Sequence, residues 1–209
     1  TVLIHRLGYL MDCRGIPPER ILTVTYTVAA TRDMRARFAR TFGEDRASRL
    51  EFRTINGISQ KVLQYFAYRT GKTPFQVADK EASAFQLVTD EGTLSSLVGE
   101  LFRACTGTFA TESTIKGLRT AITYGKNRQM SREEMEALST GELPVAQVYQ
   151  AYCRVLRQRG WMDYDDQMVY AAQILRRHGE ILAYFQEKYT HLCVEKAQDS
   201  SRIQHTILR

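Results

Sequence analysis

Residues 21–27 read ILTVTYT, and residues 28–42, which follow directly, read VAATRDMRARFARTF. The first stretch consists almost entirely of β-branched and aromatic residues, as expected of a strand buried in a parallel sheet. In the second stretch Met34, Phe38 and Phe42 recur every four residues, which places them on one face of a helix. A buried strand followed by an amphipathic helix predicts an α/β fold with a parallel sheet.

The same alternation continues on both sides of this unit. A helical pattern precedes it, a second β-like stretch ends at Asn56 and Gly57, where we expect a turn, and another helical pattern comes next. Near the C-terminus a short apolar strand follows a helix that Asp163 should cap. In order, these patterns span residues 2–11, 50–55, 58–68 and 191–194.

Helical spacing alone governs the middle of the chain, from about residue 73 to residue 160. Ser131 and Glu134 have the reciprocal spacing of a capping box at one helix start. The change in hydrophobic period predicts two structural units. These are a discontinuous parallel-sheet domain formed by residues 1–75 and 158–209, and an all-helical insert formed by residues 76–157.

The composition is that of a folded, mildly basic protein. The 209 residues are 44% hydrophobic and 25% charged, and 29 Lys and Arg against 23 Asp and Glu give a net charge of +6. This charge favours polyanionic partners only slightly. The four cysteines and four histidines are scattered, without the spacing of metal ligands. No apolar run approaches the ~18 residues of a membrane span, so we expect a cytoplasmic protein with no membrane partner.

An acidic segment, EKAQDSS at residues 195–201, directly follows the predicted strand at residues 191–194. Carboxylates in this position lie at the carboxyl edge of a parallel sheet, where open α/β proteins bind their ligands. Such an edge suits Mg²⁺ and phosphate chemistry. Taken alone, the segment is equally compatible with a solvated loop.

Four blocks of sequence, in the same order, resemble the N-terminal motor domain of UvrD/Rep-type superfamily 1 DNA helicases. Residues 192–201 (LCVEKAQDSS) are similar to the Walker B motif of that family, which usually reads Val-Asp-Glu-Ala/Phe-Gln-Asp-Thr/Ser. Residues 21–34 are similar to motif Ia, and residues 53–58 (RTINGI) to the following Thr-Phe/Ile-His-Ser-Phe block. Residues 163–168 (DYDDQM) resemble the block that leads the chain from the helical insert back to the motor domain.

This resemblance implies a RecA-like, P-loop NTPase motor domain (1A) at residues 1–75 and 158–209, with residues 76–157 as its helical insert (1B). The parent protein is then an ATP-dependent helicase that moves along single-stranded DNA and unwinds duplex junctions. Its cofactors are ATP and Mg²⁺, and a second motor domain of the same parent chain is its partner. Glu195 would order Mg²⁺, and Gln198 would sense the phosphate. The residues implied to contact DNA are Thr25, Tyr26, Thr27, Thr54 and Asn56.

The sequence departs from the family pattern at several site positions. Glu195 stands where the family has the aspartate that orders Mg²⁺, and it is still a carboxylate but one methylene longer. Lys196 stands where the family has the catalytic glutamate that orients the attacking water, and an ammonium group has no acceptor for that task. We expect Lys196 to pair with Glu195 or Asp199 instead. Asn56 stands where the family usually has a histidine, which puts some polar contacts to DNA in doubt.

The main phosphate-binding loop of the family would end directly before Thr1, and the later motifs would follow residue 209. The resemblance therefore implies that residues 1–209 alone are inactive. Gly71, Lys72 and Thr73 imitate such a loop, but Phe66 stands where the loop needs a glycine. We interpret them as a helix stop.

Each candidate also has a purely structural interpretation. Tyr26 fits a residue at the rim of the core, the three threonines fit ordinary strand positions, and Gln198 fits a cap of the helix behind it. The arginines of residues 28–42 fit a solvated helix face, and the aspartates of residues 163–166 fit a helix cap and first turn. Two rival functions stay open. One is the front half of a RecB/AddA-type helicase-nuclease, and the other is a degenerate domain that binds DNA or protein without hydrolysing ATP.

Overall fold

The computed structural model describes residues 2–72 and 86–209. Three parallel strands form a sheet in the order β2-β1-β5, with β1 at Ile21–Thr25, β2 at Glu51–Thr54 and β5 at His191–Val194. The central strand β1 is buried along its whole length, and Thr25 at its end lies opposite Thr54 of β2. The predicted α/β fold with a parallel sheet is confirmed.

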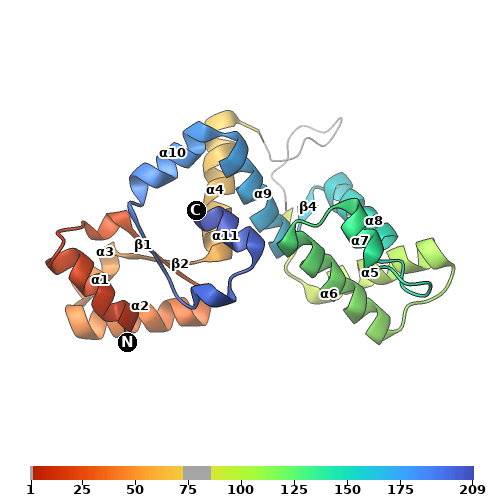
Figure 1. Cartoon of the computed structure of the whole chain (residues 1–209), viewed down its shortest axis with the longest axis horizontal. Coiled ribbons are helices and arrows are strands. Elements are labelled where there is room, and N and C mark those ends of the chain that lie inside the picture. The colour runs from red at the N-terminus through yellow and green to blue at the C-terminus, as the bar shows by residue number, and fades with distance from the viewer. Residues whose placement is uncertain (1, 73–85) are drawn as a thin grey trace.

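Helices cover both faces of this sheet, as a fully buried central strand requires (Figure 1). The first face packs against a core that contains Leu7, Phe38 and Phe52. The helices on this side are α1 (Val2–Asp12), α2 (Val28–Phe42) and α3 (Glu44–Arg49), and the short 3-10 turn η1 (Pro18–Arg20) leads into β1.

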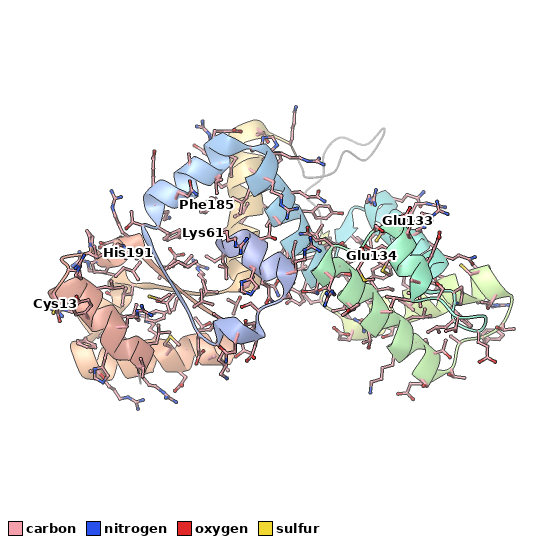
Figure 2. All side chains as sticks on the ribbon, in the orientation of Figure 1. Cys13, Lys61, Glu133, Glu134, Phe185 and His191 are labelled. Carbon is pink, nitrogen blue, oxygen red and sulfur yellow. The ribbon has the colours of Figure 1, made fainter. Side chains whose placement is uncertain are left out.

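A larger core fills the second face and includes Leu22 and Val24 of β1. Phe185 points into this core from its helix (Figure 2). The helices on this side are α4 (Ile55–Thr70), α9 (Tyr164–Arg177), α10 (Gly179–Lys188) and α11 (Arg202–Leu208). The consecutive residues Ile21 and Leu22 enter different cores, because successive side chains of a strand point to opposite faces of the sheet.

A separate group of helices lies beside the sheet and has its own core around Leu118, Val148 and Leu156 (Figure 1). We call it the helical unit. It consists of α5 (Glu91–Thr106), α6 (Glu112–Arg128), α7 (Arg132–Ala137) and α8 (Val145–Arg159). It therefore buries its apolar surface largely within itself.

The expectation of helices alone between residues 73 and 160 is wrong at one point. Gln86–Leu87 forms a short strand, β3, which pairs in parallel with β4 at Trp161–Met162. The backbone N–H of Gln86 also donates to the oxygen of Gly160. This ladder closes the helical unit where the chain enters and leaves it. Thr73, the last residue of the expected helix stop, lies outside the described residues.

The expected turn at Asn56 and Gly57 is also wrong, because both residues belong to the first turn of α4. Thr54 is the cap of that helix, and its hydroxyl accepts a hydrogen bond of 3.0 Å from the N–H of Gly57. β2 therefore passes into α4 without a loop, and the capping threonine overrides the turn preference of Asn-Gly.

Other helix ends agree with the sequence prediction. Ser131 and Asp163 both form capping boxes, and Gly71 ends α4 in the left-handed conformation with φ of 64°. The helices α3 and α10 were not predicted. Among residues 2–72 and 86–209, no helix combines the length and the apolar character that crossing a bilayer requires.

Candidate functional site

The carboxyl ends of β1, β2 and β5 lie together at one edge of the sheet. Thr25 is in register with Thr54, and the N–H of Glu195 donates a 2.9 Å hydrogen bond to the oxygen of Val24. The segments that leave this edge are residues 26–27 and residues 195–201. The predicted site residues lie in these two segments, at the ends of β1 and β2, and in the first turn of α4. They are Thr25, Tyr26, Thr27, Thr54, Asn56, Glu195, Lys196 and Gln198.

The loop after β5 has a defined conformation that depends on Lys196. This residue adopts the left-handed conformation, with φ of 52° and ψ of 45°, and is followed by the 3-10 turn η2 (Ala197–Asp199). The oxygen of Lys196 accepts a 2.9 Å hydrogen bond from the N–H of Asp199 and a 3.2 Å hydrogen bond from the hydroxyl of Tyr26. Ser201 then caps α11.

The ammonium group of Lys196 is exposed and forms no hydrogen bond or ion pair within the described part of the chain. The expected pairing with Glu195 or Asp199 is therefore wrong. The left-handed backbone directs the carbonyl of this residue toward Tyr26 and Asp199, and these contacts involve the main chain alone.

Glu195 is half-buried, and its carboxylate has no protein partner among the described residues. Within residues 2–72 and 86–209 no three acidic, histidine or cysteine residues cluster as in a metal site built from protein alone. Mg²⁺ at phosphate sites usually takes one or two carboxylates, with the remaining ligands from phosphates and water. A single uncommitted carboxylate at this edge fits that pattern.

Gln198 is exposed within η2 and is not the cap of the next helix. The side chain of Ser201 accepts from the N–H of Gln204, while the side chain of Gln204 accepts from the N–H of Ser201 at 2.9 Å. The capping interpretation of Gln198 is therefore wrong. Its amide is free of any protein contact in the part of the chain that the structure describes, and phosphate sensing stays a prediction.

Tyr26 connects the end of β1 to the loop after β5. Its ring is half-buried and packs against the core on the α4 side of the sheet. Its hydroxyl is hydrogen-bonded to the hydroxyl of Ser200 and to the oxygen of Lys196. The tip of the side chain is thus held by the acidic loop, and the ring lies at the edge of the sheet.

The three threonines at this edge all have local hydrogen-bond partners. Thr25 is buried, and its hydroxyl lies 2.7 Å from that of Thr31. Thr27 caps α2 through a 3.0 Å hydrogen bond from the N–H of Ala30, and Thr54 caps α4. Both caps place a helix N-terminus at the edge. Sequence reasoning missed this role, although a threonine directly before a helical pattern is its usual signal.

Asn56 follows Thr54 in the first turn of α4. Its Oδ1 atom is buried and has no hydrogen-bond partner in the described chain. Buried polar atoms are almost always satisfied in folded proteins. Asn56 is therefore an exception to this rule in the described chain, and its contact with DNA stays a prediction.

A buried cluster of charges, not predicted from the sequence, lies where the helical unit meets α9. The ammonium of Lys126 is 2.7 Å from Asp163 Oδ2 and 2.8 Å from Asp166 Oδ1, and only 2% of its side chain is exposed. Tyr152 donates a 2.8 Å hydrogen bond to the same oxygen of Asp163. We call Lys126, Asp163 and Asp166 the buried charge cluster. It joins α6 and α8 of the helical unit to the start of α9.

The charges of this cluster depend on one another. Burial favours the neutral form of Lys126, but the carboxylates of Asp166 and Asp163 outweigh it and hold the lysine pKa well above its usual value. Burial raises the pKa of Asp166 to about 6, although Lys126 opposes the rise. The cap and first-turn interpretation of these aspartates is correct, but they also neutralise a buried cation. The signal was its spacing, because Lys126 continues the buried stripe of Leu118 and Ile122 on α6.

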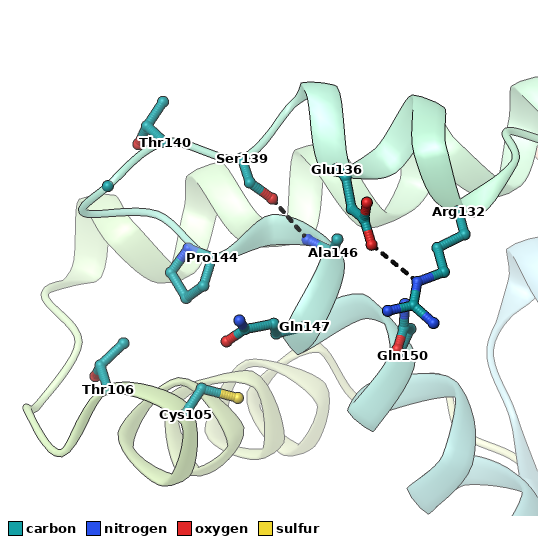
Figure 3. A pocket seen from close by; sticks show the side chains of 11 residues that line it. Cys105, Thr106, Arg132, Glu136, Ser139, Thr140, Pro144, Ala146, Gln147 and Gln150 are labelled. Carbon is teal, nitrogen blue, oxygen red and sulfur yellow. Dashed lines mark hydrogen bonds and ion pairs between the residues drawn. The ribbon is translucent and has the colours of Figure 1, made fainter.

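A separate polar hollow of about 560 Å³ lies within the helical unit, between α5, α7 and α8 (Figure 3). Two pairs of its lining residues are bonded to each other. Arg132 pairs with Glu136 at 2.8 Å, and Ser139 accepts a 3.0 Å hydrogen bond from the N–H of Ala146. No predicted site residue lines this hollow, so the sheet edge is the candidate site.

Comparison with known proteins finds one family that matches the whole chain. Residues 1–209 match the model of the UvrD/REP helicase N-terminal domain. The ATP-dependent DNA helicase PcrA of Staphylococcus epidermidis strain ATCC 35984 is 28% identical over 211 residues, and that of Staphylococcus aureus strain Mu50 is 27% identical. Both alignments cover 100% of this chain but only 27% of the relative, so the chain spans about a quarter of the length of these relatives. The match over the full length shows that this chain belongs to the UvrD/REP helicase N-terminal domain family.

Proposed function

We propose that this chain is the N-terminal motor portion of an ATP-dependent DNA helicase that moves along single-stranded DNA and unwinds duplex junctions. The observation that carries the proposal is the contact between Tyr26 and the loop of Lys196 and Ser200. It joins the segment similar to motif Ia to the segment similar to Walker B. The family match and the named helicase relatives support the same activity.

In this proposal the sheet is part of a RecA-like domain 1A, formed by residues 1–75 and 158–209, and residues 76–157 are its insert 1B. ATP would lie between this domain and a second motor domain of the parent chain. Residues 1–209 contain no Gly-x-x-x-x-Gly-Lys-Ser/Thr loop, so the cradle for the phosphates has to come from elsewhere in the parent protein.

The residues of this chain would serve the nucleotide in distinct ways. Glu195 offers the carboxylate for Mg²⁺, which when bound neutralises charge on the phosphates. Gln198 lies in the exposed turn η2, three residues after Glu195, and its amide would sense the phosphate. Lys196 offers donors but no acceptor, so it cannot align an attacking water. We therefore expect slow hydrolysis even in the complete motor.

The same edge would bind a DNA strand. An aromatic face accepts any base, which suits Tyr26 to a motor that must not read sequence. The N-termini of α2 and α4 bring N–H groups and a positive dipole end to the phosphates, and Thr27 and Thr54 fix where these helices begin. Asn56 lies beside Thr54 in the first turn of α4, at the same edge.

The second candidate function is a domain that binds DNA and hydrolyses nothing. Lys196 favours it, because the position expected to hold a carboxylate holds a free cation. Glu195 discriminates between the two candidates. An ATPase needs the negative charge of Glu195 to hold Mg²⁺, whereas a domain that only binds a DNA strand does not need it.

The test is ATP hydrolysis stimulated by single-stranded DNA, measured in a polypeptide that adds a phosphate-binding loop and a second motor domain. We expect slow, Mg²⁺-dependent hydrolysis that Glu195→Gln abolishes, because the amide keeps the size of the side chain and loses the charge. Glu142→Gln, at an exposed position of the helical unit, is the matched control. Hydrolysis that survives Glu195→Gln would exclude the proposed role, and no hydrolysis in any variant would favour the non-hydrolysing domain.

A further inference from the structure

Three arginines from three helices surround the C-terminus of α6, where the helical unit meets α9 and α11. Arg176 of α9 donates to Gln129 Oε1 at 3.1 Å and to Thr206 Oγ1 at 3.4 Å. Arg202 of α11 donates to the oxygen of Arg128 at 3.5 Å. We call Arg128, Arg176 and Arg202 the arginine seam.

These arginines are exposed, and none of them forms an ion pair in the part of the chain that the structure describes. Their hydrogen-bond partners are an amide, a hydroxyl and a carbonyl, all without charge. Elsewhere among the described residues some exposed arginines pair with acids, as Arg35 does with Glu44, while others, such as Arg14, stand alone on their elements. The seam thus concentrates positive charge without compensation.

A structural explanation accounts for part of this arrangement. Cations near a helix C-terminus interact favourably with its dipole, by about 0.3–1 kcal/mol each at exposed positions. This explains why Arg202 reaches the last carbonyl groups of α6. It does not explain three neighbouring cations, because one would satisfy the helix end and each further one adds repulsion. The excess charge indicates an anionic ligand.

An exposed aromatic ring adjoins the seam. Tyr124 precedes Arg128 by one turn of α6, and the guanidinium of Arg128 lies 5.3 Å from the centre of its ring. The tyrosine is 44% exposed. A ring beside unpaired guanidinium groups is the combination that single-stranded nucleic acids use, with a base on the ring and phosphates on the cations.

The seam is continuous with the candidate site at the sheet edge. Arg202 is the first residue of α11 and follows the loop in which Ser200 binds the hydroxyl of Tyr26. Arg202 therefore stands two residues after Ser200, the loop residue that contacts Tyr26. The buried charge cluster fixes α6 against α9 only two residues before Arg128, so the cations are held in place before any ligand arrives.

We propose that the arginine seam binds the phosphates of a nucleic-acid strand where it passes from the sheet edge to the helical unit, with Tyr124 stacking on a base. This inference rests on the proposed function and adds a subsite that is independent of Tyr26. The seam carries no base-edge contacts, so it positions the strand without reading its sequence.

The experiment measures binding of the 209-residue chain to a fluorescent 20-nucleotide oligo-dT at several salt concentrations. The seam variant is Arg128→Gln, Arg176→Gln and Arg202→Gln combined. The matched control is Arg14→Gln, Arg69→Gln and Arg154→Gln, three exposed positions on other elements that remove the same charge. Each phosphate contact on a single strand contributes about 0.7 to the slope of log affinity against log salt. We expect the slope to fall by about 2 in the seam variant and to stay close to the wild-type slope in the control.

Each outcome decides the inference. Equal slopes in the seam variant and the control would overturn the proposed role of the arginine seam. A loss of binding in Tyr26→Ala in the same series would then show that the sheet edge still binds DNA. No binding by the folded wild-type chain would overturn both proposals. Millimolar tripolyphosphate could also displace the oligonucleotide from the wild type but not from the seam variant. That result would show that the seam binds the phosphate tail of a nucleotide and not a DNA strand. Circular dichroism of each variant checks that it is folded.

Discussion

The hydroxyl of Tyr26 lies 3.2 Å from the main-chain oxygen of Lys196, so the end of β1 is hydrogen-bonded to the loop that follows β5. One partner is the residue proposed to stack on DNA, and the other stands where the family has a catalytic glutamate. A change in the loop caused by nucleotide would therefore move the tip of Tyr26. This contact offers a short physical path between the two proposed ligands.

Two substitutions separate the role of the Tyr26 ring from the role of its hydroxyl group. Tyr26→Ala should weaken binding of single-stranded DNA by about 1–3 kcal/mol, because it removes the stacking face. Tyr26→Phe should retain most of the affinity, since it removes only the hydrogen bonds to Lys196 and Ser200. Titration of a fluorescent oligonucleotide measures both. Equal losses in the two variants would show that Tyr26 supports the loop and does not stack.

Lys196 should limit hydrolysis. Residues 1–209 alone should not hydrolyse ATP, because they contain no phosphate-binding loop. In a polypeptide that supplies this loop and the second motor domain, Lys196→Glu should raise turnover by about 10²–10⁴, the usual effect of a positioned acid-base group. Lys196→Ala is the control, because it removes the cation without adding an acceptor. Fast phosphate release with Lys196 in place would show that another carboxylate orients the water.

The three residues of the buried charge cluster should stabilise the fold only in combination. Lys126→Met leaves two buried aspartates without their cation, which should cost about 3–5 kcal/mol of unfolding free energy. Adding Asp163→Asn and Asp166→Asn should restore most of the loss, because the charges then disappear together and asparagine still caps α9. Urea unfolding measures the three proteins, with Lys116→Met at an exposed position of α6 as control. A triple variant no more stable than Lys126→Met would contradict charge compensation.

Glu51 should make the free energy of unfolding depend on pH. Burial alone would raise the pKa of this carboxyl, but hydrogen bonds from Lys61, Tyr189 and Arg53 lower it to about 2 (Lys61 is marked in Figure 2). A pKa below the unfolded value means that the carboxylate stabilises the fold above about pH 4.3 and that this contribution is lost as the pH falls toward 2. Glu51→Gln should therefore lower stability at pH 7, and the difference from wild type should narrow between pH 4 and pH 2 in urea titrations. Glu112→Gln, at an exposed position, should show no such narrowing.

Much of the sheet and its helices could be predicted because their signals are local. The run of residues 21–27 is buried along β1, and the stripe of Met34, Phe38 and Phe42 faces the core or its rim. The start of α4 was misplaced because Asn-Gly is a strong turn signal and Thr54 a strong cap, and the cap prevailed. β3 could not be predicted, since a strand of two residues has no period and depends on β4, more than seventy residues away.

The candidate site likewise has features that could be predicted from the sequence and features that could not. The acidic loop and Tyr26 could be placed at one edge from the sequence, because parallel strands end together. The left-handed conformation of Lys196 could not be predicted, as it depends on contacts with Tyr26 and Asp199. Lys126 was missed for a related reason. A lysine on a helix is normally solvated, and its partners lie on a helix that begins 37 residues later.

The burial of Lys126 between two aspartates also constrains how this chain can diverge. Exchange of Lys126 alone leaves two aspartates in the interior without a cation, whereas exchange of one aspartate still leaves an ion pair and exchange of all three residues leaves no charge. Neutral drift at positions 126, 163 and 166 should therefore be concerted. Lineages should carry Lys126 with at least one of the two aspartates or an uncharged replacement of the whole set, and chains that keep both aspartates without the lysine should be rare.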